Sequence, residues 1–217
     1  KVVVRARQWA SRNEYANEKT QLHPGDVMYS SVLCDPIRTL HAYPVSDGAV
    51  ALLLASEEKA YEYTDQPIWI TGFGNCMDGY DLGTRDLASS NALKKAANQA
   101  YKMAGIKQPK KSVNLVEVMD CYAYQQPMWI EGLGLCDERE GGRFIDEYGP
   151  AKYNVNLSGG MLAGRPLMIG GLYGAAEAFL QLKGQANEHQ ASDVNCAVIQ
   201  STTGGAGQHQ TVVVLER

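Results

Sequence analysis

Short apolar runs alternate with helix-like stretches along most of this sequence, and that alternation constrains the fold more than any other feature. The runs are rich in Val, Ile, Leu and aromatic residues, which predicts β-strands at residues 49–56, 67–74, 112–120, 193–201 and 210–217. Helices are expected at residues 56–64, 87–106 and 172–184, with a short helix within 124–136. Strands that alternate with helices predict an α/β layered domain around a five-stranded mixed sheet.

Two of these segments make sharper predictions. AVALLLAS (49–56) is an unbroken apolar run, which is typical of a strand buried on both faces. The turn TTGGAGQH (202–209) joins the last two runs, and its length predicts a hairpin with antiparallel strands. By contrast, residues 1–45 are polar and loop-rich after an opening helix, and residues 137–155 are charged and contain glycine, which predicts loops.

Composition excludes several classes of protein. Hydrophobic residues make up 45% of the chain and charged residues 20%, a balance that allows a substantial core. The net charge of −4 argues against a nucleic-acid partner, and no apolar run approaches the ~18 residues of a membrane span. The five cysteines contain no CxxC pair, so we expect no metal site and reduced thiols in a cytoplasmic setting. The chain opens without Met or a secretory signal, so we expect a processed or trimmed product.

Glycine-rich junctions lie at the predicted ends of the strands. They are Ser46-Asp47-Gly48, Ser158-Gly159-Gly160, Gly170-Gly171 and residues 202–207. Exposed backbone N–H groups in such turns hold oxyanions or phosphates, and ligands collect at the edges of α/β sheets. Neither a P-loop nor a GxGxxG dinucleotide motif is present, so a nucleotide-binding fold is not supported.

Four motifs carry a family resemblance. PVSDGAVALLLAS (44–56), VEVMDCYAYQQPMWIEGLGLC (116–136), NLSGGMLAGRPLMIGG (156–171) and STTGGAGQHQTVVVLER (201–217) occur in the order found in thiolases. The chain resembles the C-terminal half of that superfamily, above all its sterol-carrier-type and archaeal branch. The resemblance implies one half of a five-layer αβαβα fold. Residues 1–45 would be part of the loop domain and a connector, and residues 46–217 the C-terminal thiolase-like domain.

The resemblance also implies a reaction. Thiolases cleave or form a carbon–carbon bond in a coenzyme-A thioester, which is a substrate, so no covalently bound cofactor is expected. A nucleophilic cysteine comes from the first half of the fold. Contacts to coenzyme A would come from Tyr43, which replaces a Ser or Cys of the family, and from Ser46, Asp47, Gly48, Ser158 and Gly159.

Two departures from the family pattern bear on the chemistry. The usual His or Asn of the HDAF-type motif is Met119, and the His of the GHP motif is Arg165 in a loop that is one residue shorter. A thioether cannot act as a base, and a guanidinium, with its pKa above about 12, cannot either. The cysteine of the closing CxGG-type motif is replaced by Thr202 or Thr203.

Three interpretations follow from these departures. The first is an unusual thiolase in which Arg165, the Gly204 N–H and His209 handle charge, with the first half elsewhere. The second is a thiolase-like aldolase that uses Tyr122, Tyr124 and Tyr43. The third is a non-catalytic subunit that supports an active partner.

Neighbouring residues leave further alternatives open. Asp120 either orients a neighbour in the site or caps a helix start, Glu117 is expected to be structural, and Cys121 is expected to be a buried thiol. Tyrosines and Trp129 near the site are compatible with a bulky or aromatic acyl group. A thiolase N-terminal half or a second thiolase-like chain is the expected partner, and the resemblance adds a small zinc-ribbon and OB-fold protein.

Overall fold

A four-stranded mixed sheet forms the centre of the computed structural model, which describes residues 1–147 and 153–217. Its strands are β3 (Trp69–Met77), β4 (Leu115–Val118), β5 (Cys196–Thr203) and β6 (His209–Glu216), in the order β3-β6-β5-β4. β4 and β5 are parallel, whereas β6 is antiparallel to both of its neighbours. The predicted hairpin between the last two strands is therefore confirmed.

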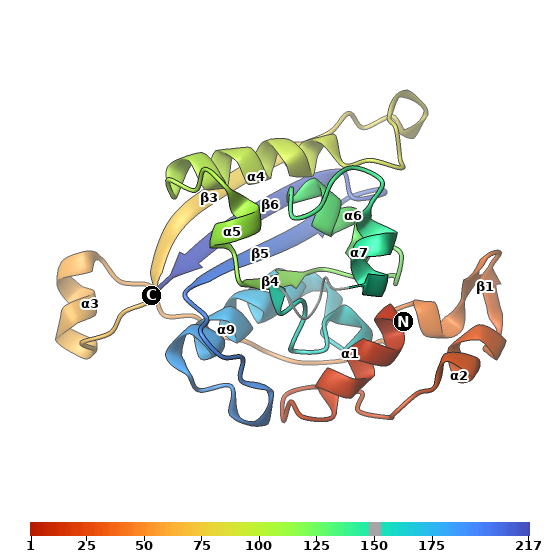
Figure 1. Ribbon diagram of the computed structural model, residues 1–217, viewed down its shortest axis with the longest axis horizontal. Coiled ribbons are helices and arrows are strands. Elements are labelled where there is room, and N and C mark those ends of the chain that lie inside the picture. Colours follow the sequence, from red (N-terminus) through yellow and green to blue (C-terminus); the bar gives the residue numbers. More distant parts are fainter. Residues whose placement is uncertain (148–152) are drawn as a thin grey trace.

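Helices cover both faces of this sheet and give three layers (Figure 1). On one face lie α4 (Asn91–Met103), the short α5 (Pro109–Ser112), α6 (Gln125–Gly132) and α7 (Gly141–Glu147). α9 (Gly170–Lys183) packs on β4 and β5 from the other face, where α1 (Val2–Ala10) also lies. This arrangement confirms the predicted α/β layered class.

The contact between α4 and β3 depends on two glycines in the strand. A Cβ atom at Gly74 would lie 1.8 Å from the carbonyl oxygen of Ala96, and one at Gly72 would lie 2.3 Å from that of Ala100. The small residues Ala92, Ala96 and Ala100 line the buried stripe of the helix. Backbone therefore approaches backbone here, and any larger residue in the strand would push α4 off the sheet.

Two hydrophobic cores lie on opposite faces of the sheet. The larger joins α4, α6 and α7 to the sheet through buried residues such as Leu93, Trp129 and Phe144. The smaller joins α9 to β4 and β5 through residues that include Leu115, Ala178 and Ile199. Sheet residues alternate between these cores, which explains why β4 and most of β5 are buried along their length.

The N-terminal residues form small elements outside the central layers. α1 packs on the 3₁₀ turn η3 (Met161–Ala163), and α2 (Pro24–Tyr29) precedes a two-stranded ribbon of β1 (Val32–Cys34) and β2 (Ile37–Arg38). The 3₁₀ turns η1 (Thr39–His41), η2 (Leu82–Thr84), η4 (Leu167–Ile169) and η5 (Asn187–His189) connect other elements. A domain boundary after residue 45 stays a prediction.

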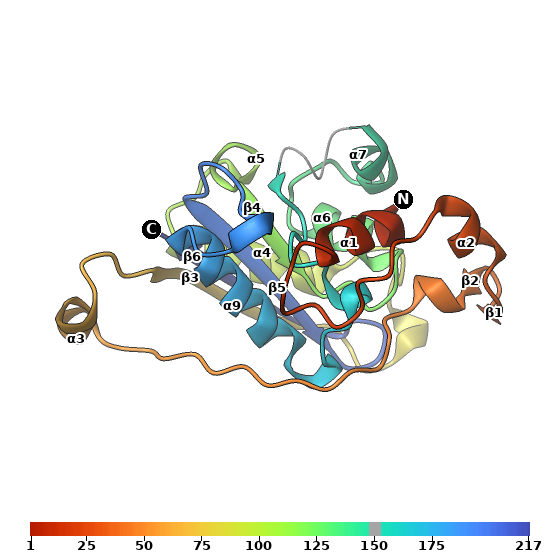
Figure 2. The same ribbon diagram turned by 90° about the horizontal axis from the view of Figure 1, so that it is seen from below.

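Residues 49–56 are not a strand, which corrects the prediction of a fifth buried one. They run as an extended, irregular segment beneath α9, and α3 (Glu57–Tyr63) then projects away from the layers (Figure 2). Leu53 is 87% exposed and Leu54 72%. The run is apolar enough for a sheet interior, but it pairs with none of the strands of the described sheet.

Most other elements lie where the sequence predicted them. β3, β4, α4 and α9 fall within or close to the expected segments, and α6 confirms the expected short helix. Residues 137–155 were predicted to be a loop, but α7 forms within them because Phe144 and Ile145 reach the larger core. Residues 148–152 lie outside the described part. Within the described ranges, no helix combines the length and apolarity that a bilayer crossing requires.

Candidate functional site

A cavity of about 610 Å³ lies where the carboxyl end of β4 meets the turn between β5 and β6. Tyr43, Tyr122 and Tyr124 form one wall, and Met119, Cys121 and Met168 bring sulfur atoms to it. Gly171 at the start of α9 and residues 201–204 and 206–207 of the hairpin also line the cavity. The sheet edge at which ligands were expected therefore carries a built cavity.

The three tyrosines form a connected aromatic cluster. The rings of Tyr122 and Tyr124 are stacked, with centroids 5.9 Å apart, and Tyr43 meets Tyr122 edge-on at 6.4 Å. Tyr43 is held in register because its backbone N–H donates to the carbonyl of Cys121 at 2.8 Å. This contact brings residues 42–43 beside the segment that follows β4, so sequence-distant tyrosines share one wall.

Met119 lies at the position where the resemblance places a histidine or asparagine. Its backbone N–H donates to Gln200 Oε1 at 3.0 Å, and its carbonyl accepts from Trp129 Nε1 at 2.8 Å. The Ser201 hydroxyl is 3.1 Å from the Met119 sulfur. The backbone is thus fixed from both sides, and a thioether stands at the position where the resemblance places an acid–base group. Trp129 itself is buried in the larger core and does not line the cavity.

Two buried glutamines connect Met119 to the hairpin turn. Gln200 Nε2 donates to Gln210 Oε1 at 2.7 Å, and Gln210 Nε2 donates to the Gly207 carbonyl and to the Thr202 hydroxyl. Their exposed fractions are 1% and 0%. Because both amides are fully engaged, they fix the glycine turn relative to the end of β4.

Asp120 holds the loop behind the cavity. Its carboxylate accepts from the Met161 N–H at 2.8 Å and from Gln126 Nε2 at 3.0 Å, and it is fully buried. Burial raises the pKa of Asp120 to about 7 against the opposing effect of the Met161 hydrogen bond. The carboxylate therefore caps η3 and orients α6, so the helix-cap interpretation describes its contacts better than a direct role in the cavity.

The cavity is electrically neutral. Among the described residues that line it, none has a side chain that is charged at neutral pH. Burial, followed by the charge of Asp120, raises the pKa of the Cys121 thiol to about 12. Burial and then Tyr122 also raise the pKa of Tyr124. These groups can donate hydrogen bonds at neutral pH, but none is a ready base or thiolate.

Arg165 lies away from this cavity, unlike the expectation that it handles charge there. Its guanidinium forms an ion pair with Glu117 and donates to the Ser158 hydroxyl, and all three side chains are buried. Glu117 also accepts from the Ser158 hydroxyl at 2.7 Å. The Arg165 guanidinium lies beside Gly174 of α9.

The structure brings together only part of the predicted site. Tyr43, Tyr122 and Gly204 line the cavity, whereas His209 lies outside it with Nε2 2.9 Å from Asn75 Oδ1. Ser46 Oγ donates to the Gly164 carbonyl at 2.7 Å, and the Asp47 carbonyl accepts from Asn17. Gly48 adjoins Tyr173, and Gly159 adjoins α1, so neither lines this cavity.

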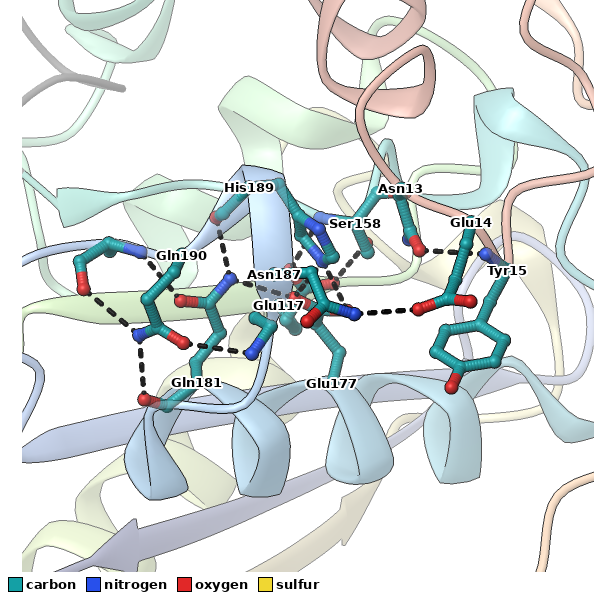
Figure 3. A network of polar contacts seen from close by, with 12 residues as sticks. Asn13, Glu14, Tyr15, Glu117, Ser158, Glu177, Gln181, Asn187, His189 and Gln190 are labelled. Atoms are coloured by element: carbon teal, nitrogen blue, oxygen red, sulfur yellow. Dashed lines mark hydrogen bonds and ion pairs between the residues drawn. The ribbon is translucent and has the colours of Figure 1, made fainter.

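A second polar network was not predicted from the sequence (Figure 3). His189 Nε2 lies 2.9 Å from Glu177 Oε1, and Gln181 Nε2 donates to the same oxygen and to the His189 carbonyl. Burial tends to lower the pKa of His189, but the hydrogen bond and charge of Glu177 outweigh it and raise that pKa. The sequence does carry a signal for this network. Glu177 and Gln181 are polar residues four positions apart on the buried face of an otherwise apolar helix.

The fold and this site define a class. The Thiolase C-terminal domain-like family matches residues 74–217, and the chain belongs to it. The acetyl-CoA acetyltransferase of Methanothermobacter thermautotrophicus is 34% identical over 96% of this chain and 55% of its own length. Rabbit (Oryctolagus cuniculus) sterol carrier protein 2 is 30% identical over 86% of this chain and 36% of its own length. The predicted branch of the superfamily is thereby confirmed.

Solved structures support the same fold. An Ltp2-ChsH2(DUF35) aldolase superposes with a TM-score of 0.89 at 22% identity, covering 99% of this chain and 56% of that one. The chain therefore spans about half the length of the acetyltransferase and of this structural neighbour.

Proposed function

We propose that this chain supplies one half of a coenzyme-A-thioester site that breaks or forms carbon–carbon bonds, using tyrosine hydroxyls where thiolases use histidines. One observation carries the proposal: the cavity at the sheet edge is lined by three tyrosines and holds Met119 in the histidine position. Aldol-type cleavage fits this lining best, because it requires hydrogen-bond donors at an enolate oxygen and no nucleophilic cysteine.

The proposed step is a retro-aldol cleavage of a 3-hydroxyacyl thioester. A base removes the proton of the 3-hydroxyl group, the C2–C3 bond breaks, and the electron pair passes into the thioester as an enolate. Tyr122 donates a hydrogen bond to the enolate oxygen, and protonation at C2 then gives the shorter acyl thioester and a ketone or aldehyde. We assign the base to the part of the fold outside this chain, because none of the groups that line the cavity is a ready base.

Acyl transfer is the second candidate, favoured by the acetyl-CoA acetyltransferase among the relatives. It requires a thiolate, and the raised pKa of Cys121 makes that residue a poor source. The nucleophile would come from the remaining half of the fold. A supporting, non-catalytic subunit is the third candidate, favoured by Arg165 turning away to Glu117.

A partner or a further segment is part of the proposal. Leu53 and Leu54 are exposed in the run that was expected to be a buried strand, and Leu172 and Phe179 are exposed on α9. An apolar surface of this kind requires cover. The remaining half of a thiolase fold, in the same chain or another, fits it, and the paired ChsH2(DUF35) in the structural neighbour supports an additional small partner. A cytoplasmic location stays a prediction.

The test uses the complete protein with any partner that co-purifies. We expect a 3-hydroxyacyl thioester to be cleaved to a shorter acyl thioester, detected by mass spectrometry, with no acyl adduct on any cysteine. Tyr122→Phe should lower kcat by about 10²–10⁴-fold, the range of positioned proton donors. Tyr80→Phe, at an exposed tyrosine outside the cavity, is the matched control.

Other outcomes choose between the candidates. A cysteine adduct that forms from a 3-oxoacyl thioester, with turnover that requires free coenzyme A, would replace the aldol proposal by acyl transfer. Binding without turnover of either substrate would assign a supporting role. Equal rates for Tyr122→Phe and the unmodified protein would remove the tyrosine from the mechanism.

A further inference from the structure

A second cavity, separate from the tyrosine-lined one, lies between α9, the turn after α1 and the extended segment at residues 49–51. Its volume is about 330 Å³, near the lower end of the range for small-molecule sites. The two cavities share no lining residue, and Gly164–Gly170 runs between them. Apolar side chains such as Tyr15, Ala176 and Leu180 make up most of the wall.

Arg165 gives this cavity a polar end. The side chain is 7% exposed, and only its Nη2 atom is engaged, with Glu117 and Ser158. Its Nε and Nη1 make no hydrogen bond with any residue in ranges 1–147 and 153–217. Arg165 lines the cavity, so an acceptor bound there would lie near donors that no described residue engages.

The extended segment is fastened over this cavity by side chains. Tyr173 Oη donates to the Ala49 carbonyl at 3.3 Å, and Ser46 Oγ donates to the Gly164 carbonyl at 2.7 Å. Asn17 Nδ2 reaches both the Asp47 and the Gly164 carbonyls. Three separate parts of the chain, at Asn17, Gly164 and Tyr173, therefore hold this segment over one side of the cavity, which is partly open to solvent.

The surrounding charges decide what kind of acceptor fits. Arg165 faces two buried carboxylates, Glu117 and Glu177, and the latter is paired with His189. With both carboxyl groups ionised, the group is neutral when His189 is protonated and carries one negative charge when it is not; burial raises the pKa of Glu117, and the charge of Arg165 opposes that rise. A carboxylate or phosphate ligand would add charge to a wall with no positive excess, whereas a neutral carbonyl oxygen would not.

We propose that this cavity is a binding site for a small, mainly apolar, neutral molecule whose carbonyl oxygen accepts hydrogen bonds from Arg165. The ketone or thioester carbonyl of an acyl compound belongs to this class. The site does not depend on the reaction proposed for the tyrosine-lined cavity, because neither its walls nor Arg165 contribute to that cavity.

Calorimetric titration with two probes of similar size tests the proposal. 4-Phenylbutan-2-one is a neutral ketone, and 3-phenylpropanoate is the matching carboxylate. With the full chain and any partner that co-purifies, we expect the ketone to bind one site per chain and the carboxylate to bind at least about tenfold more weakly. No ketone binding, or equal binding of the two probes, would overturn the proposal.

Variants locate the site. Ala176→Leu fills the cavity without touching the polar end, so it should abolish ketone binding, whereas Ala175→Leu on the same helix does not line the cavity and should leave it intact. The double variant Arg165→Met with Glu117→Gln removes the donors without leaving an unpaired charge, and it should weaken ketone binding. Unchanged binding in a folded Ala176→Leu protein would place the ketone elsewhere and end the proposal, whatever the folding of the double variant.

Discussion

Single residues fix the geometry of the tyrosine-lined cavity from behind. Met119 cannot move along the strand axis, since Gln200 and Trp129 hold its N–H and carbonyl. Gln210 accepts a hydrogen bond from Gln200 and donates one to the Gly207 carbonyl, so the glycine turn is fixed relative to Met119. The side chains of Gln200, Gln210 and Trp129 are buried and do not line the cavity. Their substitution should therefore change the free energy of unfolding and the position of the cavity residues.

Gln210→Leu should destabilise the chain. The substitution keeps the volume but leaves Gln200 Nε2 and the Gly207 carbonyl without partners in a buried space. We expect a loss of about 2–4 kcal/mol in the free energy of unfolding, measured by urea titration. Gln185→Leu, at an exposed glutamine after α9, should change it by less than about 0.5 kcal/mol. Equal effects of the two variants would show that the amide relay is not important for stability.

His189 should make the stability depend on pH near neutrality. Glu177 raises the pKa of His189 in the folded state above its ordinary value of 6.5. Because the folded-state pKa is raised, protonation of His189 stabilises the folded chain, and this stabilisation is complete below the pKa of the unfolded state. It is lost as the pH rises through the pKa of the folded state. The melting temperature of the unmodified chain minus that of His189→Gln should therefore decrease as the pH is raised from about 6 to about 8. A constant difference across this range would contradict the pairing.

The residues of the site were only partly predictable from the sequence. Tyr43, Tyr122 and Gly204 follow from motif position, because backbone position after a strand or in a turn is what a motif encodes. Arg165 does not line the tyrosine-lined cavity, and the sequence could not show this because the direction of a long side chain depends on its partners. Glu117 lies 48 residues away in sequence, and no local pattern reveals that the two meet.

Helices and strands were predicted best where the elements they pack or pair with lie in this chain. The strands β5 and β6 pair with each other, so their hairpin could be read from adjacent runs and a glycine turn. Residues 49–56 show the limit of the method, since an apolar run reports a need for burial and not the presence of a neighbouring strand. α7 was missed because its two opening glycines and charges hide the apolar pair that reaches the core.

Gly74→Ala tests the close contact between β3 and α4. The added Cβ would collide with the Ala96 carbonyl, and backbone cannot move aside as a flexible side chain does. We expect a destabilisation of about 3 kcal/mol, measured by chemical unfolding. Gly142→Ala, in α7 with open space around the added atom, should be neutral or stabilise by about 0.5 kcal/mol. A tolerated Gly74→Ala would mean that α4 can slide on the sheet.

For the whole molecule, the exposed segment 49–56 predicts how the chain responds to its partner. It has no strand partner among the described residues, so its amides should exchange with deuterium quickly in this chain alone. In the assembly with the remaining half of the fold, we expect the amides of residues 52–56 to become protected as a second sheet takes up that part of the segment, while residues 49–51 stay over the second cavity. Mass spectrometry of hydrogen exchange measures both states, with the β5 amides as a slow reference. Fast exchange in both states would mean that another surface carries the contact.

The position of β6 has a consequence for biosynthesis. Although it is formed by residues 209–216, β6 lies inside the sheet between β3 and β5, and it pairs with residues 69–77 across more than half of the chain. In the described sheet β6 is the sole hydrogen-bonding neighbour of β3, so during translation this pairing waits until β6 emerges from the ribosome. Until then, the unpaired edges of β3 are open to incorrect pairing. The four-stranded sheet can form completely only after residue 216 has been synthesised.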